Sequence, residues 1–281
     1  MAKHYEALQR AEEERRRRIG GEPTPVSAVE WDTTPDTAPI GRESLLKRLI
    51  PTTPRNRHTP DTANEINKRR ISILQPESYA AEQFRTLRGR IDSLATQRPI
   101  KTVAITSANP DEGKSTASIN LAAVTSMSVG RKVLLMDCDL RRPKIHRSLG
   151  IEPSSGLAEV LLGLSTFDDA VVRVDGLSLD VLPVRTPPAN PSELLASVEM
   201  RRLMEEISSR YDQIILDTPA CLGLPDAKTV TELCDGIILV VRADVTPRED
   251  VQTVLEILDR GRMLGLLLNG IEPNRQQYGY Y

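Results

Sequence analysis

Six short apolar runs mark the chain from residue 102 onward, and longer segments of mixed polarity separate them. The runs are rich in Val, Ile and Leu and lack polar alternation, which is typical of strands covered on both faces. They span residues 102–107, 132–137, 179–184, 213–217, 236–242 and 263–268. The segments between them predict helices over residues 114–128, 156–163, 191–209, 225–233 and 248–261. This order predicts an α/β fold with a doubly wound, mostly parallel sheet, in which ligands bind at the carboxyl ends of the strands.

The part of the chain before this regular pattern has a different composition. Prolines stand at positions 23, 25, 35, 39, 51, 54, 60 and 76, among residues with little helical or alternating apolar pattern. Such a stretch indicates a linker or a disordered arm. We therefore expect a short helix over residues 1–19 and a flexible Pro-rich linker over 20–76, so that the N-terminal arm is largely disordered. The folded domain should cover 77–271, and a short tail should cover 272–281.

Length and charge narrow the possible functions. A chain of 281 residues with 39% hydrophobic residues can bury a sizeable core. The formal net charge is only −2, so the whole molecule has no strong electrostatic preference for membranes and we expect no nucleic-acid partner. Basic runs at residues 15–18 and 68–70 are interpreted as solvated faces or arms, with contact to an anionic membrane leaflet as the alternative.

Cysteine usage and hydropathy predict a cytoplasmic protein. Cys138, Cys221 and Cys234 are isolated and lie in or beside apolar runs, which favours reduced thiols over disulfides or a zinc site. No apolar run approaches the roughly 20 residues needed to cross a bilayer. The first residues also lack the apolar core of a signal peptide. A membrane link would therefore come from a partner.

Residues 108–116, with the sequence A-N-P-D-E-G-K-S-T, carry the most specific chemical signal in the chain. They lie between a predicted strand and a predicted helix, as a phosphate-binding loop does. Backbone N–H groups of such a loop surround phosphate oxygens, and its Lys and Ser reach the phosphate and Mg²⁺. Ala108 stands where the pattern has its first glycine. The candidate nucleotide-binding residues are Asn109, Pro110, Asp111, Glu112, Gly113, Lys114, Ser115 and Thr116.

Three aspartates lie at the carboxyl ends of two predicted strands. Asp137 and Asp139 end the second strand, and Asp217 ends the fourth, in the shape of a Walker B segment. Because the carboxyl ends of parallel strands meet at one edge, these side chains should converge on the phosphate loop. Mg²⁺ prefers oxygen ligands, so we assign it to Ser115, Asp137 and Asp217.

The same residues predict phosphoryl transfer. Lys114 would offset charge on the transferred group, and one carboxylate would orient or deprotonate the attacking hydroxyl. Asp139 is the candidate for that role, because it lies two residues beyond Asp137 and is less constrained by the strand than Asp137 is. The catalytic set is thus Lys114, Asp137, Asp139 and Asp217. Arg141 and Arg142 could bind phosphate or contact a neighbouring subunit, and the alternative is that both side chains are solvated.

Four linked motifs resemble the bacterial tyrosine kinases, or BY-kinases, that accompany capsule and exopolysaccharide export. These are S-A-N-P-D-E-G-K-S-T at 107–116, L-L-M-D-C-D-L-R-R-P at 134–143, L-G-I-E-P-S-S-G-L-A-E-V-L-L-G at 149–163 and Y-D-Q-I-I-L-D-T-P at 211–219. The resemblance spans about residues 75–281 and implies a P-loop NTPase-like fold. It also implies an ATP- and Mg²⁺-dependent, non-specific protein-tyrosine autokinase that regulates polysaccharide polymerisation and export.

A further segment resembles the E-x-x-R-x-x-R motif through which these kinases form ring-like homo-oligomers. Glu82, Arg85 and Arg88 occupy its positions, and at helical spacing they share one face. The alternative is an i,i+3 salt bridge between Glu82 and Arg85 on an exposed helix.

The last residues carry three of the six tyrosines: Tyr278, Tyr280 and Tyr281. The family places its autophosphorylation sites in such a tail, and a phenol is the nucleophile that the reaction requires. The alternative is a docking tag. The resemblance further implies other protein tyrosine substrates and a membrane chain-length-determinant or co-polymerase activator, which would recruit the kinase to the inner face of the plasma membrane.

Two other functions remain open from the sequence. A partition or cell-division ATPase shares the fold, but those proteins carry a second lysine five residues before the loop lysine, where this chain has Asn109. A non-catalytic ATP-binding regulator of an export complex would have much the same sequence.

Overall fold

The computed structural model describes residues 70–271. The expected N-terminal helix, most of the linker and the tyrosine tail lie outside the described residues. Helix α4 (Ile71–Leu74) falls inside the range expected for the linker. It packs against helix α6 (Lys114–Ser126), and the backbone N–H of Ser72 donates to Asn120 Oδ1 at 2.8 Å. The folded part therefore begins before the boundary predicted at residue 77.

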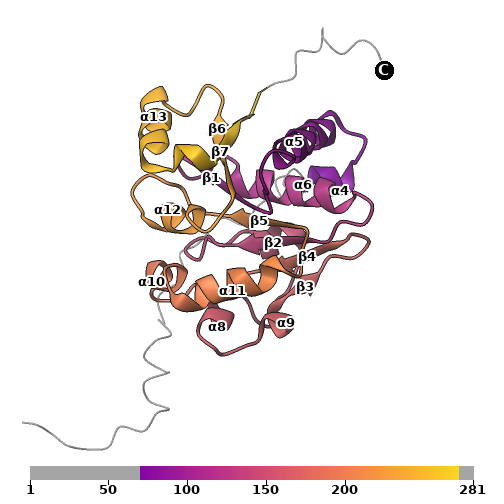
Figure 1. Cartoon of the computed structure of the whole chain (residues 1–281), viewed down its shortest axis with the longest axis vertical. Helices are drawn as coiled ribbons and strands as arrows, with labels where there is room; N and C mark the ends of the chain where they lie inside the picture. The colour runs from indigo at the N-terminus through magenta and orange to yellow at the C-terminus, as the bar shows by residue number, and fades with distance from the viewer. Residues whose placement is uncertain (1–69, 272–281) are drawn as a thin grey trace, which may run out of the picture. The chain divides into compact units, whose positions relative to one another are not determined.

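A seven-stranded sheet forms the centre of the described residues (Figure 1). The strands are β1 Thr102–Ser107, β2 Val133–Asp137, β3 Val172–Arg173, β4 Leu179–Leu182, β5 Gln213–Asp217, β6 Gly236–Arg242 and β7 Met263–Asn269. Their order is β3-β4-β2-β5-β1-β6-β7. All neighbours are parallel except β3, which pairs antiparallel with β4. The predicted α/β fold with a mostly parallel sheet is thus confirmed.

All six predicted strands are present. Five of them are largely buried, as the apolar runs require, whereas no residue of β7 is buried and its Leu266 and Leu268 are exposed. Every residue of β1, β2 and β5 is buried, so neither face of these strands meets water. Strand β1 lies between β5 and β6, which places the loop that follows it at the middle of one sheet edge. Strand β3 is a seventh strand that the sequence did not predict, since two residues give no pattern.

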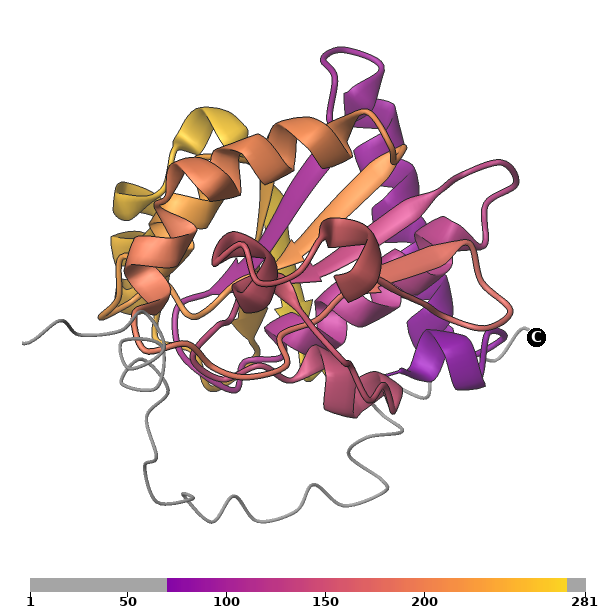
Figure 2. The same ribbon diagram turned by 90° about the horizontal axis from the view of Figure 1, so that it is seen from below.

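Helices cover both faces of the sheet (Figures 1 and 2). Besides α4 and α6, the described helices are α5 Tyr79–Ala95, α7 Ile145–Leu149, α8 Leu157–Leu161, α9 Phe167–Ala170, α10 Pro191–Leu195, α11 Val198–Ser208, α12 Asp226–Thr231 and α13 Arg248–Ile257, with a 3₁₀ turn η1 at Arg260–Arg262. Helices α5, α6 and α7 share one apolar cluster with the sheet, and α8 to α11 share another on the opposite face. This is the doubly wound arrangement that the sequence predicts.

One predicted helix, residues 191–209, is two helices in the structure. Ser197 separates α10 from α11, and its hydroxyl accepts from the backbone N–H of Met200. A serine in this place satisfies an otherwise unpaired N–H at the start of a helix. The new start turns α11 so that Met200, Met204 and Ile207 face the sheet.

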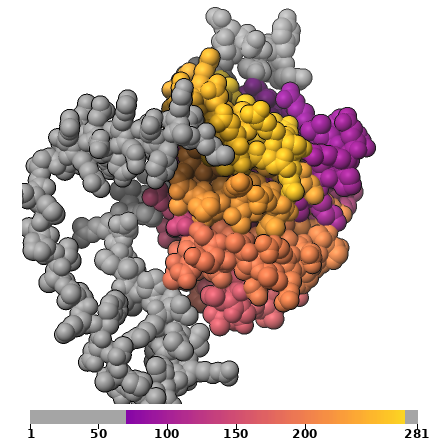
Figure 3. Space-filling view, turned by 60° about the vertical axis from the view of Figure 1, so that its left-hand side comes forward, coloured from indigo at the N-terminus to yellow at the C-terminus, as the bar shows by residue number. Residues whose placement is uncertain are grey.

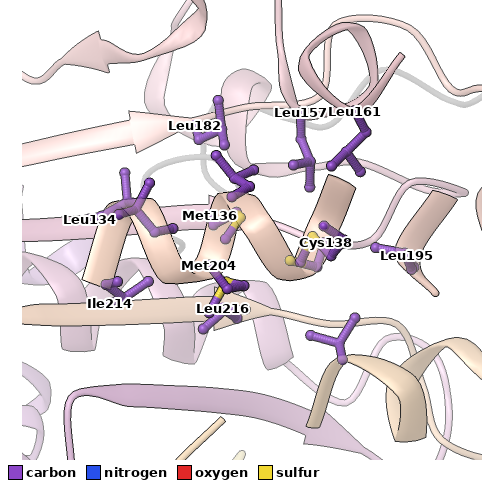
Figure 4. Close-up of a cluster of buried hydrophobic side chains, with 14 of the residues drawn as sticks. Leu134, Met136, Cys138, Leu157, Leu161, Leu182, Leu195, Met204, Ile214 and Leu216 are labelled. Carbon is purple, nitrogen blue, oxygen red and sulfur yellow. The ribbon is translucent and has the colours of Figure 1, made fainter. Parts of the chain in front are cut away.

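The core beneath α11 is packed mainly with aliphatic side chains and sulfur (Figure 4). Leu134 and Met136 of β2, together with Leu216 of β5, point into it beside Cys138. Burial of such side chains is the main favourable contribution to folding. It also fixes strands β2 and β5, whose carboxyl ends bear Asp137 and Asp217.

The last described elements pack beside the segment around α5. In the space-filling view the yellow surface of the C-terminal elements adjoins the purple surface of the segment around α5 (Figure 3). Arg98, which follows α5, donates from Nη1 to the carbonyl of Gly261 in η1 at 2.9 Å. Among residues 70–271, no helix is both long and apolar enough to span a bilayer.

Candidate functional site

The loop between β1 and α6 has the backbone geometry of an anion-binding turn. Asp111 has φ 61° and Gly113 has φ 101°, so two left-handed residues flank Glu112. Alternating left- and right-handed conformations can turn successive backbone N–H groups toward one point. Ala108 is buried in an apolar cluster with Cys221 and Ala227. Ala108, which stands where the motif has its first glycine, therefore packs in the core just after the end of β1.

Side chains from distant elements brace this loop. Glu112 accepts from the backbone N–H of Asn109 at 3.0 Å and from the Thr246 hydroxyl at 2.6 Å. The Asn109 amide in turn donates to Asp250 of α13 at 2.7 Å. Of the predicted nucleotide-binding residues, Asn109 and Glu112 thus direct their side chains into the protein. They would meet a nucleotide through their backbone.

A cavity of about 250 Å³ opens beside the loop. Pro110, Asp111, Lys114 and Ser115 line it from the loop, as the sequence predicts, and Asp139 lines it from the end of β2. Its other cationic side chains are Arg141, Arg142 and Lys144, and its apolar wall is formed by Pro219, Ala220, Leu222 and Leu224. Four cations in one cavity suit a polyphosphate.

Asp137 and Asp217 are neighbours at the carboxyl ends of β2 and β5, where they are paired in register. Both are completely buried. Burial, and then the charge of Asp217, raise the pKa of Asp137 well above its usual value. Burial also raises the pKa of Asp217 to about 6, although the nearby Ser115 hydroxyl and the Lys114 charge oppose the rise. Two buried carboxylates side by side repel each other, and a cation would relieve that repulsion.

The structure offers one observation that fits a metal ion here. Oδ2 of Asp217 is buried and has no hydrogen-bond partner among the described residues, while Oδ1 accepts from the Ser118 hydroxyl at 3.0 Å. A buried oxygen of this kind is costly unless something binds it. Within residues 70–271, no group of three His, Cys, Asp or Glu side chains is arranged to hold a metal by itself. A Mg²⁺ ion would therefore take most ligands from phosphate and water, as it commonly does.

Asp139 differs from the other two aspartates. It is half-buried, lines the cavity, and accepts from the backbone N–H of Arg142 at 2.9 Å. The backbone N–H of Asp139 donates to Asp137 Oδ1 at 3.2 Å. Its carboxylate is thus anchored but reachable from the cavity, which is the position that a base acting on an incoming hydroxyl requires.

Arg141 has an intramolecular role that the sequence left open. Its Nε donates to Asp226 Oδ2 at 2.6 Å, and its Nη2 donates to the Ser192 hydroxyl at 2.9 Å. Arg141 therefore joins the end of β2 to helices α10 and α12 while it lines the cavity. Lys144 forms an ion pair with Asp111 at 2.6 Å, and this contact lowers the pKa of Asp111.

The E-x-x-R-x-x-R segment lies on α5, as its helical spacing predicts. Glu82 and Arg85 form an ion pair with each other. Arg88 turns toward α6 and donates from Nη1 to the carbonyl of Val124 at 2.7 Å. In the described residues the motif is therefore satisfied within one chain, and Arg88 supports the packing of α5 on α6.

Sequence reasoning missed four residues that hold the phosphate loop: Arg242, Thr246, Asp250 and Asn269. Each lies more than 130 positions away from its partner in the loop. For Arg242 and Asn269, the sequence signal that could have indicated a role at the site is their position at the ends of β6 and β7.

Comparison with known proteins agrees with this geometry. A family model described as an AAA domain matches residues 100–262. The tyrosine-protein kinase YwqD of Bacillus subtilis is 40% identical over 214 residues, which cover 75% of this chain and 90% of YwqD. The chain belongs to the bacterial tyrosine-protein kinase family. The putative tyrosine-protein kinase CapB of Staphylococcus aureus is 32% identical and is covered to 92%.

Solved structures share this fold to different extents. The kinase domain of the Escherichia coli tyrosine kinase ETK matches with a TM-score of 0.69 at 30% identity, covering 85% of this chain and 91% of that one. The cell-division ATPase MinD of Pyrococcus furiosus matches with a TM-score of 0.52 at 25% identity, covering 60% of this chain and 71% of that one. This cell-division ATPase thus shares the architecture, but over less of the chain.

Proposed function

We propose that this protein is an ATP-dependent protein-tyrosine autokinase that regulates the polymerisation and export of an exopolysaccharide or capsule. The observation that carries the proposal is the convergence of Lys114 and Ser115 with the buried pair Asp137 and Asp217 at one sheet edge. Relatives support the biological setting, since one of them is named the succinoglycan biosynthesis transport protein ExoP of Rhizobium meliloti.

Each residue of the site has a distinct task in phosphoryl transfer. Lys114, which is buried, contributes positive charge where the transferred phosphoryl group becomes more negative. Asp139 accepts the hydrogen of the attacking tyrosine hydroxyl and orients it toward phosphorus. The backbone N–H groups of the loop hold the phosphates that remain.

Ser115, Asp137 and Asp217 would hold Mg²⁺. When bound, this ion offsets the charge shared by the two terminal phosphates of ATP. Ser118 assists by keeping Oδ1 of Asp217 occupied, so that Oδ2 remains for the ion or one of its waters.

The proposed acceptors are Tyr278, Tyr280 and Tyr281, in the tail that lies outside the described residues. Tyr281 is ten residues beyond Ile271, and ten fully extended residues span at most about 33 to 36 Å. That reach suits a neighbouring copy of the chain, which agrees with a ring-like homo-oligomer built through Glu82, Arg85 and Arg88. A membrane co-polymerase would recruit this cytoplasmic kinase to the inner face of the plasma membrane.

A partition ATPase is the weaker alternative, and Asn109 is the reason. Its side chain donates to Asp250 of the same chain, where a partition protein would present a lysine to its partner's nucleotide. A non-catalytic regulator remains an outcome of the experiment.

Mass spectrometry of the C-terminal peptide tests the proposal. The full chain is incubated with Mg-ATP and a membrane activator, and the wild type is compared with Lys114→Met. Lys132→Ala serves as the control, because half of the Lys132 side chain is exposed on the surface. We expect phosphotyrosine in the wild type and the control, and none in Lys114→Met. Equal phosphorylation in all three proteins would refute autokinase activity, and ATP binding without phosphotyrosine would support the regulator.

A further inference from the structure

Asn269, the last residue of β7, contacts the phosphate loop at its most constrained point. Its amide Nδ2 donates to the backbone carbonyl of Glu112 at 2.9 Å. The same amide lies against the next residue, where a Cβ on Gly113 would stand only 2.0 Å from Nδ2. The φ of 101° favours glycine at position 113, and a Cβ there would also displace the Asn269 amide.

This contact determines how one peptide group is oriented. The carbonyl and the N–H of a trans peptide point in opposite directions. Because the Glu112 carbonyl points at Asn269, the N–H of Gly113 points to the other side of the loop. The next two residues, Lys114 and Ser115, line the cavity.

The neighbouring peptide is held in a similar way. Arg242, at the end of β6, donates from Nη1 to the carbonyl of Asp111 at 3.3 Å. Arg242 and Asn269 are register partners in the paired strands β6 and β7. Two adjacent strand ends therefore hold two successive carbonyls, and the N–H groups of Glu112 and Gly113 are left for a ligand.

We propose that Asn269 is a positioning residue for phosphate binding: it fixes the Glu112–Gly113 peptide so that the Gly113 N–H donates to a phosphate of the nucleotide. The inference rests on the proposed nucleotide site and does not depend on tyrosine as the phosphate acceptor. Asn269 is not among the residues that line the cavity, and it acts through this peptide.

Other side chains besides Asn269 hold the loop in place. The side chain of Glu112 is already held by Asn109 and Thr246, and that of Asn109 by Asp250. Without Asn269 the loop would stay where it is, but the Glu112 carbonyl would lose its partner and the peptide could rotate. The loss should therefore fall on phosphate binding and spare the stability of the fold.

Two substitutions test this role. Asn269→Asp keeps the shape of the side chain, removes the donor and sets a carboxylate against the Glu112 carbonyl, and Asn269→Ala removes the side chain. The matched control is Leu268→Ala, in the same strand, where the side chain is largely exposed. Titration calorimetry measures the binding of Mg-ADP and of adenosine, which has no phosphate. Thermal unfolding is measured without nucleotide.

We expect both Asn269 variants to bind Mg-ADP about tenfold more weakly, as the loss of one well-placed hydrogen bond implies, with Asn269→Asp the weaker of the two. Adenosine affinity and unfolding temperature should match those of Leu268→Ala. Unchanged Mg-ADP affinity would overturn the proposal, and so would an equal loss for adenosine together with a lower unfolding temperature. A selective loss of Mg-ADP binding in a protein that never forms phosphotyrosine would uphold this inference while the autokinase proposal fails.

Discussion

Nε of Arg141 lies 2.6 Å from Oδ2 of Asp226, in an ion pair that joins the end of β2 to the first residue of α12. Asp226 is almost completely buried, whereas the Arg141 side chain is partly exposed. Ser192 completes the contact, since its hydroxyl bonds to both partners. The wall of the nucleotide cavity is thereby tied to two helices on one face of the sheet.

Arg141→Ala should lower the free energy of unfolding by about 1 to 3 kcal/mol, because it leaves a buried carboxylate with fewer partners. Asp226→Asn should cost less, since it removes the buried charge. Urea unfolding of both single variants and the double variant measures the coupling. We expect the double variant to lose clearly less than the sum of the two. Additive losses would mean that the pair contributes no coupling energy.

The nucleotide-free protein should become more stable when Asp217 is replaced by Asn. Burial raises the pKa of Asp217 to about 6, so near neutral pH the native state bears a carboxylate that it disfavours. The unfolded chain ionises it freely. We expect a gain of about 1 to 3 kcal/mol at pH 7 with complete loss of kinase activity.

The pH dependence of this gain follows from the sign of the shift. The folded pKa lies above the unfolded value, so the penalty is present above pH 6 and fades as the pH falls toward 4. Thermal unfolding of Asp217→Asn and the wild type at pH 5 and pH 7.5 should show the larger difference at pH 7.5. Asp139→Asn is the control, because Asp139 is only half-buried. A gain that is independent of pH would contradict the explanation.

Arg85 and Arg88 should separate assembly from stability. Arg88 bonds to a carbonyl near the end of α6, so Arg88→Ala should cost about 1 to 2 kcal/mol in urea unfolding. Arg85 pairs only with exposed Glu82 in the described residues, so Arg85→Ala should change stability by less than about 0.5 kcal/mol. Light scattering should show that Arg85→Ala weakens self-association. A variant that assembles as the wild type does would argue against an interface through Arg85.

Two glycines give opposite expectations for the same substitution. A Cβ on Gly156 would lie 2.3 Å from the carbonyl oxygen of Pro183, which is backbone and cannot rotate away. Gly156→Ala should therefore destabilise the fold by about 2 kcal/mol. Gly89 is in the interior of α5 with open space around it, so Gly89→Ala should stabilise by about 0.5 to 1 kcal/mol. Calorimetric unfolding of both variants measures the two changes in stability. Equal changes for Gly156→Ala and Gly89→Ala would contradict the steric argument.

The sequence predicts most of the sheet because its strands are buried on both faces and carry unbroken apolar runs. Asp137 and Asp217 were predicted together for the same reason, since each follows such a run in a parallel sheet. Strand β3 escaped prediction because its two residues gain their form only by pairing with β4. The break at Ser197 was missed because its capping role competes with an otherwise continuous helical pattern.

The contacts that brace the phosphate loop could not be predicted in this way. Asn269 and Thr246 are separated from Glu112 by the whole of β2 to β6, and neither residue type is specific to a nucleotide site. Only the strand order, which places β6 beside β1 and β7 beside β6, brings them to the loop. Sequence patterns report local burial, whereas these contacts depend on tertiary placement.

The hydrogen bond from Asn269 also has a consequence for biosynthesis. The two residues that it joins are 157 positions apart, so the ribosome adds Asn269 about 8 to 30 seconds after Glu112. Throughout that interval the nascent chain carries the loop sequence without the strand end that orients it. Cellular ATP therefore cannot stabilise the nascent domain by binding to a fully oriented phosphate loop. The chain must complete most of its sheet before it can bind the nucleotide.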